Sequence, residues 1–327
     1  MKDFIDHWKI IILFFIPLCS IAQKLQVVDA ENRSPIAFAT ISFGDGLGSF
    51  ADEEGFFTYS KKQYADIDTL FISAMGYSDK SVPTNFENES EAKIVALTVE
   101  VSELGEIIVS APRAGKFRFR KQKANTHNDI FACWLPTVES EVAVLFQRYE
   151  ERATQISKLY LPVNAESKYE SKGKGKFATL FRIQFYENND GFPGTGIPYK
   201  NIVFAMDEKA DKVFDLDLLS ESIFIPDSGI FVSLQVLGYA KANGKLMDTK
   251  KYREIKTSRG VQKISTAFRP LLPFVKGEAK EKTFVRRIFL NNKNWQVFDI
   301  SYNPNSQLIQ KGYRNYGMGA EFKVWEE

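Results

Sequence analysis

Residues 34–43 read SPIAFATISF, and residues 52–57 read DEEGFF. The first stretch places apolar residues at alternate positions, which is typical of a β-strand with one face on a core. The second combines three acidic residues with Gly55, whose tolerance of positive φ suits a tight turn into the next strand. A strand, an acidic turn and another strand in this order predict an all-β module near the start of the chain.

The same pattern of short strands and turn residues continues on both sides, over residues 24–110. Two further pieces are SAMGY at 73–77 and LGEIIV at 104–109. With the two stretches above, these pieces resemble the carboxypeptidase-regulatory-like domain, a prealbumin-type sandwich common in exported proteins of the Bacteroidetes. The resemblance covers about a quarter of the chain, and residues 47–50 depart from the Gly-Thr pair that the family usually has there. It implies an accessory fold that brings no peptidase.

The first 22 residues are typical of a secretory signal peptide. Residues 10–18 form a continuous apolar run, IIILFFIPL. This run is too short for a membrane-spanning helix, which needs roughly twenty residues, but it suits a signal-peptide core. Small residues then lead to an expected cleavage between Ala22 and Gln23. We therefore expect an exported protein, located in the periplasm, on the outer membrane surface or outside the cell.

Cleavage would also remove Cys19 and one of the two histidines. We expect membrane contact only if Cys19 is lipidated, and the bulky Leu18 before it disfavours that modification. One cysteine, Cys133, and one histidine, His127, would remain. A zinc carboxypeptidase holds its metal with two histidines and a glutamate, so the mature chain cannot build that site. We expect no metal, no cofactor and, for Cys133, a buried inert thiol.

A formal net charge of +2 conceals a difference between the two parts of the chain. Residues 24–112 carry 6 Lys and Arg against 15 Asp and Glu, a net of −9, whereas residues 113–327 carry 35 against 24, a net of +11. Two separately folded modules with different surfaces would explain this difference. An anionic partner of the basic part, such as an acidic glycan, is the alternative. The small overall charge does not indicate nucleic acid.

Residues 112–139 are expected to form a basic linker. Within it, residues 116–120 (KFRFR) predict either an edge strand protected by charge or a contact with an anionic surface. From residue 140 the strand signals resume and continue to residue 327 with few helical stretches. Roughly ten strands at this spacing predict a jelly-roll-like sandwich.

The sequence thus predicts an all-β protein in four parts. A signal peptide (1–22) precedes an N-terminal prealbumin-like β-sandwich (23–111). The basic linker (112–139) then leads into a larger, jelly-roll-like C-terminal β-sandwich (140–327).

Four residues of the C-terminal sandwich are candidates for ligand binding. Trp295 stands beside Asn292 and Asn294, and Tyr199 lies in a glycine-rich stretch. Aromatic faces can stack on sugar rings while amides bind the hydroxyl groups. In the alternative interpretation, Trp295 belongs to the strand core and the asparagines serve a hairpin turn.

For catalysis, Asp215 and Asp217 are the candidate carboxylate pair, because residues two apart on a strand share one face. A glycosidase needs such a pair, but carboxylates on the solvent face of strands are common, and we expect no catalytic residue. The expected function is that of an exported, non-catalytic binding or scaffold protein of the cell envelope, with an envelope protein or polysaccharide as partner. The alternative is a carbohydrate-active hydrolase that uses the carboxylate pair.

Overall fold

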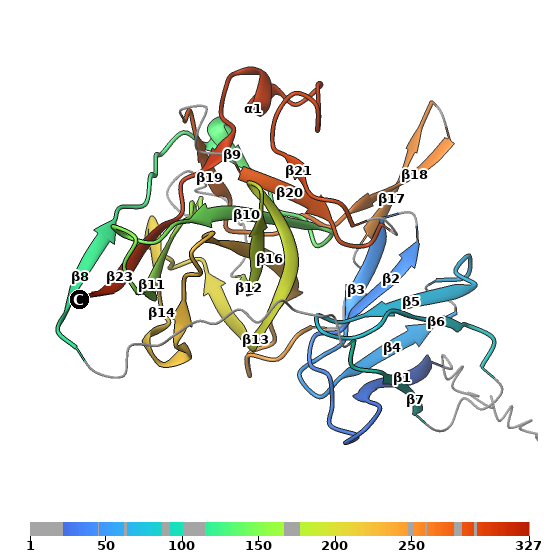
Figure 1. The fold of residues 1–327 in the computed structure, drawn as a ribbon. Coiled ribbons are helices and arrows are strands. Elements are labelled where there is room, and N and C mark those ends of the chain that lie inside the picture. The colour runs from blue at the N-terminus through green and yellow to red at the C-terminus, as the bar shows by residue number, and fades with distance from the viewer. Residues whose placement is uncertain are drawn as a thin grey trace, which may run out of the picture.

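The computed structural model describes residues 22–44, 46–61, 64–86, 92–100, 115–166, 177–247, 252–258, 260–277, 283–290 and 293–326. Nearly all regular structure in these ranges is β-strand, as the alternating pattern predicts, and the strands form two sandwich modules (Figure 1). The predicted signal peptide, apart from Ala22, lies outside the described residues. Within these ranges no helix has the length and apolar character that a membrane crossing requires.

The first module is a prealbumin-like sandwich with immunoglobulin-like layering of two small sheets. One sheet has the order β4-β1-β7, and the other has the order β3-β2-β5-β6. Their strands are β1 (Ala22–Asp29), β2 (Thr40–Gly44), β3 (Leu47–Phe50), β4 (Phe56–Ser60), β5 (Thr69–Ser73), β6 (Lys80–Pro83) and β7 (Lys93–Leu97). Strands β1 and β7 run parallel, and the other pairs are antiparallel.

The acidic turn of this module forms where the sequence predicts it. Gly55 has a φ of 75°, in the left-handed region that favours glycine. Asp52 Oδ1 accepts hydrogen bonds from the backbone N–H groups of Glu54 at 3.1 Å and Phe56 at 2.7 Å. The carboxylate of Asp52 therefore closes the turn that starts β4.

The second module is a larger, jelly-roll-like sandwich. Its six-stranded sheet has the order β13-β12-β16-β10-β20-β21, and its five-stranded sheet has β14-β11-β23-β8, with β15 also paired to β11. The six strands are β10 (Ser140–Phe146), β12 (Ala178–Asn189), β13 (Phe192–Asp207), β16 (Ile230–Tyr239), β20 (Thr283–Arg287) and β21 (Gln296–Val297). The facing sheet has β8 (Phe117–Gln122), β11 (Thr154–Pro162), β14 (Val213–Asp217), β15 (Ile223–Phe224) and β23 (Gly319–Trp325).

Smaller elements complete the chain. A three-stranded sheet joins β9 (Cys133–Trp134), β19 (Leu272–Val275) and β22 (Asn315–Tyr316), and β17 (Tyr252–Thr257) pairs with β18 (Gly260–Ser265). The short helices are η1 (Ile130–Ala132), η2 (Leu219–Glu221) and α1 (Gln307–Gln310).

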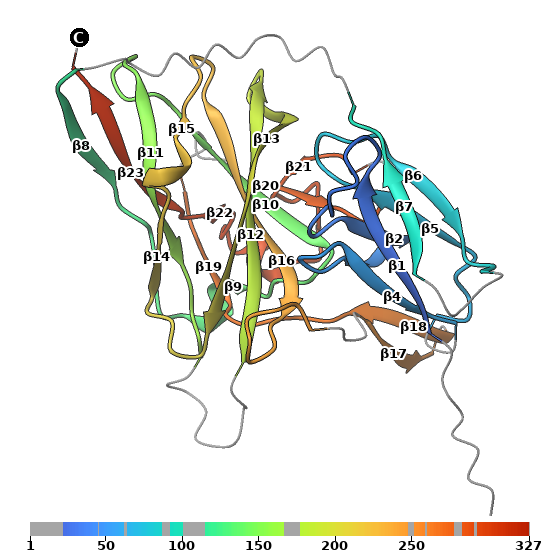
Figure 2. The same cartoon turned by 90° about the horizontal axis from the view of Figure 1, so that it is seen from below.

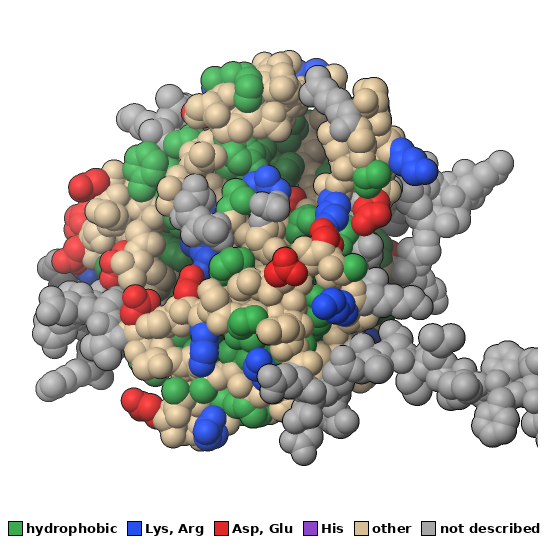
Figure 3. Space-filling model, turned by 90° about the vertical axis from the view of Figure 1, so that its right-hand side faces the viewer, with side chains coloured by type: hydrophobic (Ala, Val, Ile, Leu, Met, Phe, Trp, Pro, Cys, Tyr) green, Lys and Arg blue, Asp and Glu red, His purple; other side chains and the backbone are tan. Residues whose placement is uncertain are grey.

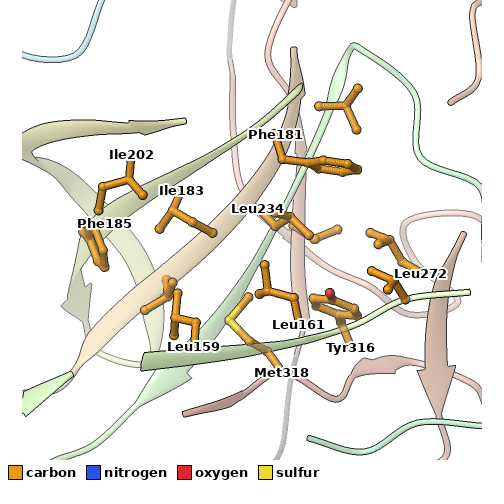
Figure 4. Close-up of a cluster of buried hydrophobic side chains, with 14 of the residues drawn as sticks. Leu159, Leu161, Phe181, Ile183, Phe185, Ile202, Leu234, Leu272, Tyr316 and Met318 are labelled. Carbon is orange, nitrogen blue, oxygen red and sulfur yellow. The ribbon is translucent and has the colours of Figure 1, made fainter. Parts of the chain in front are cut away.

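The core of the second module lies between its two sheets. Phe181, Ile183 and Phe185 alternate along β12 and point toward Leu159 and Leu161 of β11 (Figure 4). Alternate residues of a strand share one face, so the pattern in the sequence becomes one continuous apolar layer. Burying a side chain of this size contributes about 1.5–3 kcal/mol.

The range predicted as a linker supplies structure to the second module. Strand β8 pairs antiparallel with β23 along the edge of the five-stranded sheet. Phe117 and Phe119 on it are 46% and 50% exposed. The edge-strand interpretation of residues 116–120 is thus confirmed. Elements η1 and β9 also fall within residues 112–139.

The molecule has three layers, seen edge-on in Figure 2: the five-stranded sheet, the six-stranded sheet and the first module. The β17–β18 hairpin of the second module reaches across to the first (Figure 2). There Tyr252 is 3% exposed and belongs to the hydrophobic core of the first module. The outer face of the six-stranded sheet is therefore covered by another module.

Candidate ligand site between the modules

The two modules contact each other through backbone, ring and ion-pair interactions. Ser42 Oγ donates a hydrogen bond to the backbone oxygen of Phe289 at 2.7 Å, and the rings of Phe50 and Phe289 lie 5.6 Å apart. Lys293 Nζ forms an ion pair with Asp79 Oδ2 at 2.9 Å. The packing is close enough that a Cβ atom on Gly48 would lie 2.4 Å from Phe289 Cδ1.

Two phenylalanines of the first module extend the hydrophobic cluster of the second. Phe38 and Phe50 are 5% and 2% exposed, and both belong to that cluster. Phe38 has a φ of 55°, a conformation that a non-glycine residue seldom adopts. Its carbonyl accepts a hydrogen bond from Arg182 Nη1 at 3.0 Å. The first module is thereby tied to the central strands of the second.

Four polar residues form one row across the face of the six-stranded sheet that the first module covers. The strand register pairs Arg182 with Gln235, Gln235 with Glu141, and Glu141 with Arg286. The row thus crosses β12, β16, β10 and β20. Because successive side chains of a strand alternate between faces, this row lies opposite the apolar residues of the core.

Glu141 is the anion of this row and is fully buried, with a side-chain exposure of 0%. Its Oε2 pairs with Arg286 Nε at 2.7 Å, and its Oε1 accepts hydrogen bonds from Tyr186 at 2.8 Å and Ser233 at 2.5 Å. The Arg286 guanidinium also lies over the rings of Tyr186 and Trp295, at 4.9 and 4.6 Å from their centroids. Buried charges need partners of this kind.

Arg182 is buried differently, because its hydrogen-bond acceptors are neutral. Its Nε donates to Gln235 Oε1 at 2.9 Å, Nη2 donates to the same oxygen at 2.5 Å, and Nη1 donates to the carbonyl of Phe38. The residue is 6% exposed, and its guanidinium lies 5.4 Å from the ring centroid of Phe50. Among the described residues, no carboxylate accepts a hydrogen bond from it.

These environments shift the pKa values of the two arginines of the row and of the neighbouring Tyr186. Burial lowers the pKa of Arg182 to about 10, against the opposing charge of Glu141. Burial also acts to lower the pKa of Arg286, but the charge of Glu141 and the hydrogen bonds to Glu141 and Tyr186 raise it overall. Burial raises the pKa of the Tyr186 hydroxyl. At neutral pH both arginines are cationic and Tyr186 is a neutral donor.

A cavity of about 670 Å³ opens at this junction. Both modules line it, and twelve of its nineteen lining residues are polar. From the first module come Thr40, Ser73, Ala74, Met75, Gly76, Tyr77, Asp79, Val99 and Glu100, and from the second Arg182, Gln184, Tyr186, Thr195, Gly196, Pro198, Gln235, Arg286, Ile288 and Lys293. A second cavity of about 320 Å³ shares six lining residues with it: Ala74, Met75, Tyr77, Arg182, Gln184 and Pro198.

The charged side chains at the surface on this side of the molecule alternate in sign. Figure 3 shows Lys and Arg interspersed with Asp and Glu over the visible face. Between the modules, Lys293 forms an ion pair with Asp79, and Lys245 forms another with Glu54. The opposite charges of the two modules, visible in the sequence, thus meet in part at their own contact.

Among the predicted ligand-binding residues that the structure describes, Tyr199 lies apart from Asn294 and Trp295. Tyr199 packs on Phe185, with ring centroids 5.2 Å apart, and lines the smaller cavity. Trp295 lies near the opposite edge of the sheet, edge-on to Tyr186 at 5.2 Å, and lines neither of the two cavities. Asn294 is exposed, and Asn292 lies outside the described residues.

The candidate carboxylate pair lies on the edge strand β14. Asp215 and Asp217 are both exposed there. Asp215 is 3.9 Å from Lys158 Nζ, and Asp217 Oδ1 accepts a hydrogen bond from the backbone N–H of Leu219 at 2.9 Å. Neither residue lines a described cavity.

Sequence reasoning missed the polar row, although a signal for it was present. Arg182 and Gln184 interrupt the apolar residues of β12, and Gln235 and Glu141 do the same in β16 and β10. In an isolated antiparallel sheet this alternation indicates a solvent-facing side. Only the covering module shows that the side is buried.

The fold and the site define the class of protein: two packed β-sandwich modules with a polar cavity between them. Residues 26–109 match the family model of the CarboxypepD_reg-like domain, which agrees with the resemblance seen in the sequence. A search of curated proteins finds no match to this chain.

Proposed function

We propose that this chain is an exported, non-catalytic binding protein of the cell envelope whose ligand, an envelope polysaccharide or protein segment, occupies the cavity between the modules. The observation that carries the proposal is the cavity of about 670 Å³ whose wall both modules build. Pockets for small ligands commonly measure roughly 300–1,000 Å³. Because each module supplies part of the wall, a bound ligand would also stabilise the contact between them.

Export rests on the sequence, through the apolar run at residues 10–18 and the small residues before Gln23. The match of residues 26–109 to the CarboxypepD_reg-like domain is compatible with export. Cleavage after Ala22 would leave the pairing of β1 with β4 intact from Gln23 onward. Sequencing the N-terminus of the protein from the envelope fraction should give Gln23 as the first residue, and an intact Met1 would contradict export by this signal.

The hydrogen-bond partners and the positions of the carboxylates near the cavity favour a binding function over hydrolysis. Both oxygens of Glu141 are engaged by hydrogen-bond donors. Of the two carboxylates that line the cavity, Asp79 is paired with Lys293 and Glu100 is exposed. A glycosidase instead uses two carboxyl groups that face one another across a cleft.

The experiment is a glycan-array and envelope pull-down screen with the chain from residue 23 onward. Thr195 is exposed and lines the cavity, so Thr195→Trp should fill the cavity and abolish binding. Thr126 is also exposed but lines no described cavity, and Thr126→Trp is the matched control. A wild-type protein that binds nothing, or a Thr195→Trp variant that binds like the wild type, would contradict the proposal.

A further inference from the structure

The polar row carries more positive than negative charge. Arg182 and Arg286 contribute two cations, and Glu141 contributes one anion that is already paired with Arg286. A guanidinium has five N–H donors, and the described residues accept three hydrogen bonds from Arg182. Burying a cation without an anion is costly. Arg182 is therefore the group at which an incoming anion gains most.

The position of Arg182 makes it accessible to a ligand while it is shielded from bulk solvent. The residue lines both the larger and the smaller cavity. Gln235 and Phe38 accept hydrogen bonds from three of its five N–H groups, one each on Nε, Nη1 and Nη2, and hold the guanidinium in place. An anchored guanidinium loses little side-chain entropy on binding, and its geometry matches a carboxylate.

The remaining wall favours a hydroxyl-rich ligand over an apolar one. Hydroxyl groups come from Thr40, Ser73, Tyr77 and Thr195, and Gln184 supplies an amide. The Tyr77 hydroxyl donates to Asp29 and Ser73 Oγ accepts from Lys293, so Tyr77 remains an acceptor and Ser73 a donor, whereas the other groups can both donate and accept, as the hydroxyls of a sugar require. The aromatic and thioether surface of Tyr77 and Met75 offers an apolar contact for a sugar ring.

We propose that the cavity binds an acidic sugar, a uronic acid unit of a polysaccharide, with its carboxylate on Arg182 and its hydroxyls on the polar wall. This inference rests on the proposed function and names its ligand class. Arg286 supplies a second positive charge nearby, but Glu141 holds it in place. Arg182 is thus the residue that selects the carboxylate over a neutral sugar.

The test is calorimetric titration of the chain from residue 23 onward with a glucuronic acid disaccharide and its neutral glucose counterpart. We expect the uronate to bind at least tenfold more tightly than the neutral sugar. Arg182→Met should remove that preference, whereas Arg152→Met, on the turn between β10 and β11 and outside the described cavities, should leave it unchanged. Equal affinity of the wild type for the two sugars would overturn the inference.

Folding of the variants is checked separately, because Arg182 also contacts Phe38. Thermal unfolding of Arg182→Met must remain cooperative. Arg182→Lys keeps the positive charge but lacks the planar guanidinium group, and it should retain part of the preference for the uronate over the neutral sugar. An N-acetylated dialanine peptide with a free carboxylate is the second ligand tested. Tighter binding of that peptide than of the uronate would overturn the sugar assignment.

The two levels of the proposal can fail separately. Equal affinity of the wild type for the uronate and the neutral sugar, with both excluded by Thr195→Trp, would refute the acidic-sugar inference and leave the proposed function standing. Binding of every ligand unaffected by Thr195→Trp would refute both.

Discussion

Arg182 and Phe38 form a hydrogen bond across the module boundary: the guanidinium Nη1 donates to the Phe38 carbonyl at 3.0 Å, and Phe38 has a φ of 55°. Phe38 N–H in turn donates to the Asp52 carbonyl at 3.1 Å. The unusual backbone of Phe38 is therefore stabilised by partners from both modules. The same arginine that we assign to ligand binding also connects the modules.

Close packing at the module boundary predicts the effect of Gly48→Ala. The new Cβ would lie 2.4 Å from Phe289 Cδ1 and 2.5 Å from the Ile41 carbonyl oxygen. Overpacking of this kind costs about 1–3 kcal/mol, and we expect that loss in urea unfolding. Gly115→Ala is the control, because its Cβ would have an ordinary contact of 3.4 Å with Trp325. Equal stability of both variants would show that the boundary is looser than described.

The buried ion pair of Glu141 with Arg286 predicts a large effect of Glu141→Gln. The substitution leaves the half-buried side chain of Arg286, 18% exposed, without its anion, beside Arg182 with its neutral partners. Breaking one partner of a buried pair costs about 3–5 kcal/mol. The control is Glu150→Gln, because Glu150 pairs with Arg118 at exposures of 47% and 35%, where exposed pairs contribute about 0–1 kcal/mol. Chemical denaturation of both variants measures the difference in their free energies of unfolding. Comparable losses of stability would contradict the claim that Glu141 and Arg286 form a desolvated ion pair.

Tyr252, on the β17–β18 hairpin, packs into the core of the first module, and this contact predicts the effect of Tyr252→Ala. The Tyr252 side chain is 3% exposed, and its ring lies 6.1 Å from that of Tyr64. Removing a buried aromatic side chain costs about 3–5 kcal/mol, so we expect the first module to become markedly less stable. Tyr149→Ala, at a residue 38% exposed, should change stability little. Hydrogen exchange of β1 and β4 amides would report the loss in the first module directly.

The thiol of Cys133 predicts a pH dependence of chemical modification. Burial raises its pKa from the model-peptide value of 9.0 to about 12, and Asp129 and Glu166 add to the shift. Because the thiolate is the reactive form and a more basic thiolate is only partly compensated by its greater nucleophilicity, the native protein should react with a disulfide reagent at pH 8 at least about tenfold more slowly than the unfolded chain.

The raised pKa of Cys133 also fixes the direction in which the stability of the protein changes with pH. A raised pKa means that folding favours the protonated thiol, so the contribution of Cys133 to stability is complete below pH 9 and is lost as the pH rises toward 12. Stability is measured in urea at pH 8 and pH 10, with Cys133→Ser as control. Rapid labelling of the native protein at pH 8 would contradict the raised pKa.

How much the sequence predicts differs between the two modules. In the first, residues 34–43 and 52–57 carry local signals, an alternating strand and a turn with Gly55, and the structure contains both. In the second, the alternation on β12 predicts strands and one apolar face correctly. The extent of the linker is less predictable, because β8 is incorporated into the second module by pairing with β23, about two hundred residues later.

The strands, their apolar faces and the acidic turn can be identified from local sequence, because they follow from interactions between near neighbours. That Arg182, Gln235, Glu141 and Arg286 form one row, and that this row is covered, is apparent only in the folded molecule. Register between strands far apart in the chain depends on packing of the whole sheet. The contact between modules, through Phe38 and its partners, then turned a face that looked solvent-exposed into the wall of a cavity.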